Sequence, residues 1–206
     1  LDNWNPVGLR GTCSQSYRVH DVFVPEEFTS TREYPEERRE PGPLYAIPQH
    51  GLYAVGVAGV ALGISRAMLD AFRELAMAKT PRGRPRMADD KLVQAGFAKQ
   101  EAAWGSAYAY ILHTLEDIYA RADEWAVIEV EDRGRLRLAC SNSIHQSIAV
   151  ADWVHKEAGV SAIFPGSPFE RRWRDIHTVS QQIQSRGAHY EAIGSIFLGQ
   201  PPEVFF

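Results

Sequence analysis

The spacing of hydrophobic residues changes once along the chain, and the change divides it into two parts. Between residues 17 and 24, apolar and polar positions alternate, which predicts a β-strand that ends at Pro25. From about Pro48 onward, apolar residues recur every three or four positions, which predicts helices. We therefore expect a mainly α protein, an up-down four-helix bundle with a short β-strand remnant at its N-terminus.

The first two predicted helices are long. Apolar residues at helical spacing run from Ala61 to Leu75, and Pro81 should end the first helix. Glycines at 56, 59 and 63 on this helix suggest a close approach of a neighbouring backbone. An aspartate at 89 or 90 can cap the second helix, which should end near Asp123.

The last helices are predicted from their turn signals. We expect a turn at residues 132–134 to precede the third helix, and Gly159 to close it. Ser167, Pro168 and Glu170 predict the fourth helix start, as N-cap, first residue and capping box. That helix should continue to a break at residues 186–187, followed by a short helix.

These elements predict three segments. Residues 1–30 are the tail of a β-domain, residues 31–47 are a linker rich in proline and charge, and residues 48–206 are a C-terminal helical bundle. The chain opens on Leu1 rather than Met, and we expect that the beginning of the β-domain is missing.

Composition narrows the class of protein. A formal charge of −4 and a pI near 6.0 argue against nucleic acid as a partner. The longest apolar run, residues 52–64, is too short to span a bilayer, and no signal peptide precedes it. Cys13 and Cys140 are expected to be reduced, so we predict a cytoplasmic protein with no membrane partner and no metal site.

Four stretches in fixed order carry a resemblance to a known family. They are the Gly-Leu-Arg-Gly-Thr turn with the strand to Pro25; residues 79–85 with 92–94; residues 157–162; and residues 171–175 running to 189–194. With these stretches the chain resembles the C-terminal part of the acyl-CoA dehydrogenase superfamily. It is most similar to the branch of two-component flavin-dependent monooxygenases, which use reduced flavin from a separate reductase.

The resemblance implies an enzyme of three domains, with FMN or FAD held between the β-domain and the bundle. It implies a homotetramer built through the bundles, a flavin reductase as partner and a small-molecule substrate. Lys79 would lie against the flavin phosphate, with Arg82 in the same loop as a substitute. From the residues alone, Lys79 is equally well explained as a lysine at a helix C-terminus.

Two further turns are candidates for flavin binding by the same resemblance. Thr12 and Ser14 offer hydroxyls to flavin or substrate, and the turn with Val160 and Ser161 would lie beside the flavin. The alternatives are a turn that simply needs polar side chains and a plain helix C-cap.

Gln182 and His177 are the candidate catalytic residues. The resemblance places Gln182 where monooxygenases carry a histidine and close to where acyl-CoA dehydrogenases carry a glutamate. A glutamine amide donates and accepts hydrogen bonds but does not titrate, so it can orient flavin without acting as a base. His177, five residues earlier, should point to another face of the helix.

Three functions remain open from the sequence. The first is the bundle part of a flavin-dependent monooxygenase acting on an aromatic or hydrophobic substrate. The second is an acyl-CoA dehydrogenase acting on a CH–CH bond, against which the missing glutamate counts. The third is a non-catalytic helical oligomerisation domain, which large apolar helix faces would suit. Whichever of these three functions the parent protein has, we expect the fragment by itself to be inactive.

Overall fold

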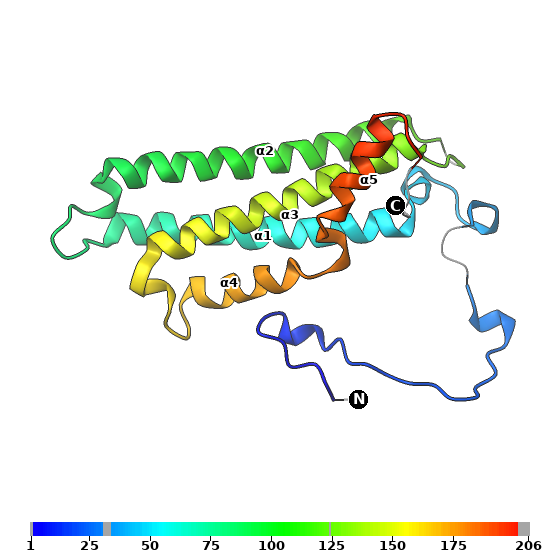
Figure 1. The fold of residues 1–206 in the computed structure, drawn as a ribbon, viewed down its shortest axis with the longest axis horizontal. Helices are drawn as coiled ribbons and strands as arrows, with labels where there is room; N and C mark the ends of the chain where they lie inside the picture. The colour runs from blue at the N-terminus through cyan, green and yellow to red at the C-terminus, as the bar shows by residue number, and fades with distance from the viewer. Residues whose placement is uncertain (1, 31–33, 124, 202–206) are drawn as a thin grey trace.

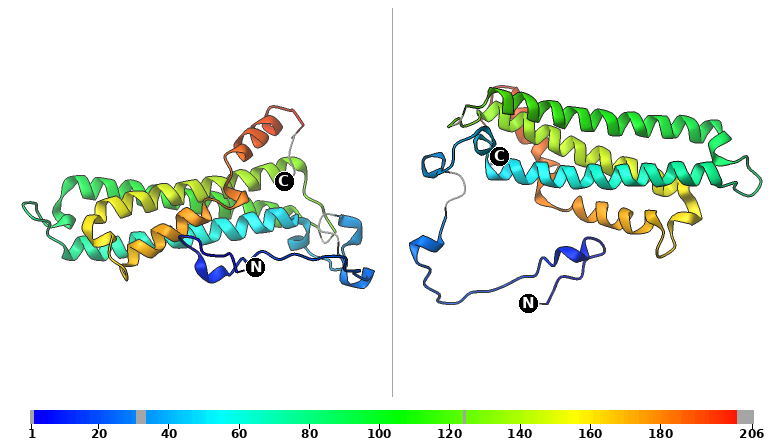
Figure 2. Two further views of the ribbon diagram at one scale, coloured as in Figure 1. Left: turned by 60° about the horizontal axis from the view of Figure 1, so that its bottom comes forward. Right: turned by 180° about the vertical axis from the view of Figure 1, so that it is seen from behind.

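The computed structural model describes residues 2–30, 34–123 and 125–201. This part of the chain is mainly helical, and successive long helices run in opposite directions along one axis (Figure 1). The helices are α1 (Gln49–Ala78), α2 (Lys91–Arg121), α3 (Val130–Ala158), α4 (Pro168–Val179) and α5 (Ala188–Phe197). The predicted helical bundle is therefore confirmed, with α5 crossing one end of it (Figure 2).

Helix α3 lies at the centre of the bundle. It packs against α1, α2, α4 and α5, whereas α1 and α2 have few contacts with each other. Phe72 of α1 sits in this core between Phe97 and Trp153, with ring centroids 5.9 and 5.0 Å away. Gly96 lets α2 approach closely, because a Cβ there would lie 2.5 Å from the Trp153 ring.

Helix α1 is longer than the apolar run at residues 52–64, and its length changes the comparison with a bilayer. By length and composition alone it could cross a membrane, since its best 18-residue window has a mean hydropathy of 1.7. Part of that apolar surface forms the bundle core, including Met68, Leu69 and Phe72. No described residue of this chain approaches the Cβ positions of the glycines at 56, 59 and 63 within 4 Å, so the predicted close neighbour is absent from the chain's own described residues.

The turn predicted at residues 132–134 is wrong, because these residues lie inside the first turns of α3. Asp132 accepts hydrogen bonds from Arg121 of α2 and from Arg135, and a carboxylate near a helix N-terminus is favourable. Gly134 serves packing instead of a turn: its absent Cβ would lie 3.4 Å from Ile196 of α5.

Helix α4 begins as predicted but ends early. The Ser167 hydroxyl caps it by accepting from the Phe169 N–H at 3.2 Å. The other half of the capping box does not form, because the Glu170 carboxylate pairs with Arg174 one turn ahead. The helix stops at Val179, and residues 183–185 form a separate 3-10 turn before the predicted α5.

The structure does not show the predicted N-terminal strand. Residues 17–24 belong to no sheet, the backbone bends at Asp21, where φ is +47°, and Tyr17 and Phe23 are 84% and 87% exposed. A strand exists only when its backbone pairs with another strand, and the described residues supply no partner strand. The segment runs past α4 toward the start of α1 (Figure 2), and the predicted linker, 31–47, begins outside the described residues.

Candidate functional site

Lys79 and Ser161 come together where α1 and α3 end. Lys79 is the residue that follows α1, and its ammonium donates to the Ala158 carbonyl at 2.8 Å and to the Ser161 hydroxyl at 3.0 Å. Gly159, with φ of +58°, lets the chain turn after α3, and Val160 is 60% exposed beside it. We call Lys79, Val160 and Ser161 the lysine corner.

The hydrogen bonds of Lys79 also fit the alternative given by the sequence, a lysine at a helix C-terminus. An ammonium that bonds the last carbonyls of a helix is favoured by the helix dipole. Arg82 lies exposed in the following turn and forms no hydrogen bond or ion pair with the described residues. The structure therefore brings Lys79 and Ser161 together and leaves Arg82 outside the contact.

The N-terminal turn docks on α4 through backbone contacts. The Leu9 N–H donates to the Asp175 carboxylate at 2.7 Å, and the Arg174 guanidinium donates to the Val7 carbonyl. Gly8 lies directly against the helix, because a Cβ there would be 2.3 Å from the Arg174 carbonyl oxygen. Arg174 and Asp175 thus hold the N-terminal segment to the bundle.

The hydroxyls of Thr12 and Ser14 stabilise their own turn. Thr12 donates to the Leu9 carbonyl at 2.9 Å, and Ser14 donates to Thr12 at 3.3 Å. Both side chains are exposed. Cys13 adopts a φ of +47°, a left-handed conformation that costs a residue with a Cβ more than it costs glycine.

His177 and Gln182 do not meet. The His177 Nε2 atom lies 2.8 Å from the Asp152 carboxylate of α3, which also accepts from the Trp173 indole N–H at 2.8 Å. The Trp173 ring lies between His177 and His155, with centroids 4.4 and 4.9 Å away. Sequence reasoning missed Asp152, because no local pattern links residues 25 positions apart on two helices.

Gln182 follows α4 instead of lying on it. Its side-chain oxygen accepts the Gln184 N–H at 2.6 Å and caps the 3-10 turn. The residue is exposed, so its amide N–H₂ remains accessible on the surface. This region and the lysine corner lie at opposite ends of the 12-residue α4, which is about 18 Å long.

Two further histidines, His145 and His189, each contact a backbone carbonyl. His145 lies 2.8 Å from the Ser185 carbonyl and 3.1 Å from the Tyr190 hydroxyl. His189 lies 2.8 Å from the Ile183 carbonyl, and burial lowers its pKa. Burial likewise raises the pKa of the Cys140 thiol to about 12, so this cysteine is a core residue and not a nucleophile.

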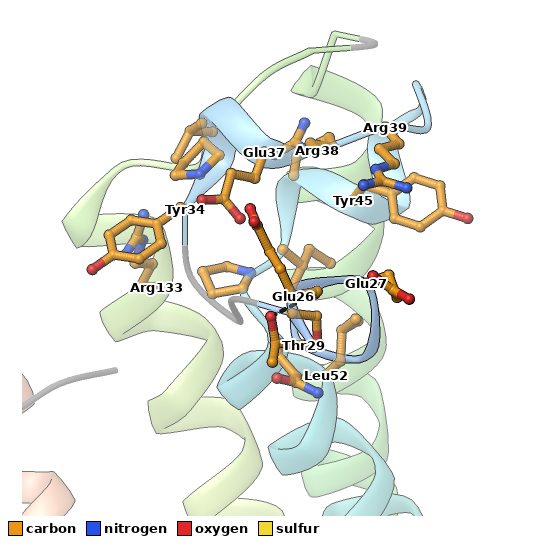
Figure 3. Close-up of a pocket in the computed structure, with 17 residues that line it drawn as sticks. Glu26, Glu27, Thr29, Tyr34, Glu37, Arg38, Arg39, Tyr45, Leu52 and Arg133 are labelled. Atoms are coloured by element: carbon orange, nitrogen blue, oxygen red, sulfur yellow. Dashed lines mark hydrogen bonds between the residues drawn. The ribbon is translucent and has the colours of Figure 1, made fainter. Parts of the chain in front are cut away.

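A separate cavity of about 560 Å³ lies at the far end of the bundle (Figure 3). The chain before α1 forms one wall, and the start of α1 with Val127 and Arg133 forms the other. Glu26, Glu37 and Arg38 are among the charged residues that face it. None of the site residues predicted from the sequence lines this cavity.

The described residues hold no group of three or more metal-ligating side chains. The candidate site therefore offers an ammonium with a hydroxyl, an accessible amide and a histidine that is already paired with a carboxylate. These groups can bind phosphate and form hydrogen bonds to a planar ligand, and the amide cannot take up a proton.

The chain as a whole is similar to known proteins of one family. Residues 55–186 match the family described as acyl-CoA dehydrogenase, C-terminal domain. Indole-3-acetate monooxygenase of Pseudomonas putida is 30% identical over 202 residues, which is 98% of this chain and 51% of the relative. The oxygenase subunit HsaA, a flavin-dependent monooxygenase of Rhodococcus jostii, is 29% identical over 85% of this chain and 48% of its own length.

Solved structures give the same fold. XiaF from a Streptomyces species, solved in complex with FADH2 and glycerol, superposes with a TM-score of 0.86 at 22% identity. The match covers 100% of this chain and 54% of XiaF. The chain thus spans about half the length of the relatives it matches.

Proposed function

Because the chain belongs to the acyl-CoA dehydrogenase C-terminal domain family, we propose that it is the bundle portion of a flavin-dependent monooxygenase. The whole protein would use reduced flavin and oxygen on an aromatic or other hydrophobic small molecule. The observation that carries this proposal is the match over 98% of the chain to a monooxygenase of indole-3-acetate, at 30% identity. The match to HsaA, another flavin-dependent monooxygenase, supports it.

The donor groups of the bundle fit a flavin. Lys79 and Ser161 supply a cation and a hydroxyl within 3.0 Å of each other, a pair suited to a phosphate. The exposed Gln182 amide suits the polar edge of a flavin ring, and the Thr12 and Ser14 hydroxyls lie on the segment docked to α4. Reduced flavin, when bound, supplies the electrons that activate oxygen.

Gln182 limits the chemistry that the bundle itself performs. Its amide can hold a ligand in place, but it cannot remove a proton from a substrate. His177 does not take the place of Gln182, because it lies five residues earlier on α4 and its Nε2 atom is held against Asp152 of α3. We therefore expect substrates whose electron-rich ring reacts without prior loss of a hydroxyl proton.

The longer protein would have further partners. We propose that residues 1–30 complete a β-domain, that a separate cytoplasmic reductase supplies the flavin, and that the protein is a homotetramer. The glycines at 56, 59 and 63 support the last point, because they leave a face of α1 without side chains that could obstruct a second copy.

Flavin titration of the longer parent protein tests the proposal. We expect it to bind reduced flavin, and K79M to weaken that binding at least about tenfold, because a charged hydrogen-bond donor is lost. K156M is the matched control, since Lys156 is exposed in the last turn of α3. A parent that binds no flavin would refute the proposal and favour an oligomerisation domain, and bleaching by an acyl-CoA would favour a dehydrogenase.

A further inference from the structure

Arg137 of α3 is a buried cation that forms no ion pair with the described residues. Its exposed fraction is 3%, and its Nη2 atom donates to the His50 carbonyl at 3.3 Å. Its Nε and Nη1 atoms find no acceptor among the described residues. Arg135, two residues earlier, differs in every respect, because it is partly exposed and bonds both Asp117 and Asp132.

The surroundings of Arg137 are positively charged. A small, partly open void of about 10 Å³ is lined by Pro48, Gly51, Ile128, Arg133, Leu136 and Arg137. Both charged residues in that lining are arginines, and Pro48 and Gly51 belong to the N-terminal end of the 30-residue helix α1. A helix N-terminus adds further positive potential.

Among the described residues, no acidic side chain pairs with Arg137 or lines the void. Burial lowers the pKa of Arg137, and the charge of Arg137 contributes to the lowered pKa of His189, which favours its neutral form. Glu26, Glu27 and Glu37 line the larger cavity of Figure 3, which shares Pro48 and Arg133 with the void, but they do not line the void itself.

We propose that this void is a binding site for one small anion, such as chloride, held by Arg137 at the N-terminal end of α1. Size decides between anions, because a volume of about 10 Å³ is room for about one water molecule. A monatomic halide exceeds that size only slightly and needs a small outward movement of the lining, whereas an organic carboxylate exceeds it by several atoms. Charge decides between an anion and water, because a buried ion is costly unless an opposite charge accompanies it. The anion would hold the start of α1 against α3.

Bromide identifies the site directly in crystals of the full chain grown with sodium bromide in place of chloride. We expect an anomalous scattering peak in the void, within hydrogen-bond distance of the Arg137 guanidinium. A void that contains only water, with no anomalous peak, would overturn the proposal.

Thermal unfolding at matched ionic strength gives an independent result. Relative to sodium gluconate, sodium chloride or bromide should raise the Tm by about 3 to 5 °C at tenfold excess over the Kd. Sodium acetate, whose anion is too large, should not. Equal Tm values in all these salts would count against the site.

Two variants separate binding from general salt effects. R137M should lose the halide response, and in gluconate it should be at least as stable as the wild type, because no uncompensated charge is buried. R135M should keep the full response. An unchanged halide response in R137M would refute the proposal, and if R137M does not fold, the bromide crystal decides. All of these readouts are independent of flavin and activity.

Discussion

The contact between Gly8 and α4 makes a prediction that depends on a single methyl group. In G8A, the new Cβ would lie 2.3 Å from the Arg174 carbonyl oxygen and 2.7 Å from the Asp175 nitrogen. Both are backbone atoms of a helix, so the N-terminal segment must move away by about 1 Å to reach ordinary contact distances of about 3.5 Å. That movement breaks the 2.7 Å bond from the Leu9 N–H to the Asp175 carboxylate.

The magnitude follows from that bond. A hydrogen bond to a charged group contributes about 1.5 to 3 kcal/mol, so the undocked state of G8A should be roughly 10 to 150 times more populated than in the wild type. Hydrogen exchange measures this as an equal acceleration at the Leu9 amide, with unchanged exchange in the middle of α3.

Gly11 provides the control for G8A. It lies in the same turn, and no described atom approaches its Cβ position within 4 Å, so G11A should leave Leu9 exchange unchanged. If G8A exchanges at the wild-type rate, or if G11A accelerates exchange equally, the docking of this segment on α4 is not as described.

Three further outcomes are expected. By urea unfolding, G96A should destabilise the chain by about 1 to 3 kcal/mol, because its Cβ meets an indole ring at 2.5 Å, whereas G105A on the same helix meets nothing and should be neutral or stabilising by up to about 1 kcal/mol. At pH 8 a thiol reagent should modify the exposed Cys13 quickly and Cys140 only on unfolding, since burial raises the pKa of Cys140 to about 12; equal rates would contradict this. Because burial lowers the pKa of His189, the unfolded state binds a proton more readily, so the stability from this group is present above about pH 6.5 and is lost as the pH falls below it. H189Q, which keeps a hydrogen-bond donor, should show a smaller loss between pH 7.5 and 5.5, and an unchanged pH profile would refute the assignment.

The helices could be predicted wherever local signals and packing agree. Asp90 caps α2 and Ser167 caps α4, as their positions suggested, because capping depends only on neighbouring residues. The turn at residues 132–134 was wrong, because Gly134 is there to let α5 approach, and a contact 62 positions away leaves no local signal. The strand at residues 17–24 depended on partner strands that the described chain does not hold.

The candidate site could be predicted only in part for the same reason. Lys79 and Ser161 are brought together, a contact that the sequence did not predict, and the bond to the Ala158 carbonyl equally fits a helix-terminal lysine. Gln182 was expected on a helix, but the Ser185 hydroxyl bonds the Ser180 carbonyl and helps to end α4 before it. The roles of these residues toward flavin stay predictions.

The central position of α3 has a consequence for the order in which the chain can fold. During synthesis, α1 and α2 leave the ribosome first, yet they make few contacts with each other and bury their apolar faces mainly on α3. Until Ala158 has emerged, the long apolar helix α1 lacks the main partner that covers it. The nascent chain should therefore remain a substrate for chaperones until α3 is complete, and a truncation after Arg121 should aggregate, while one after Phe197 should fold.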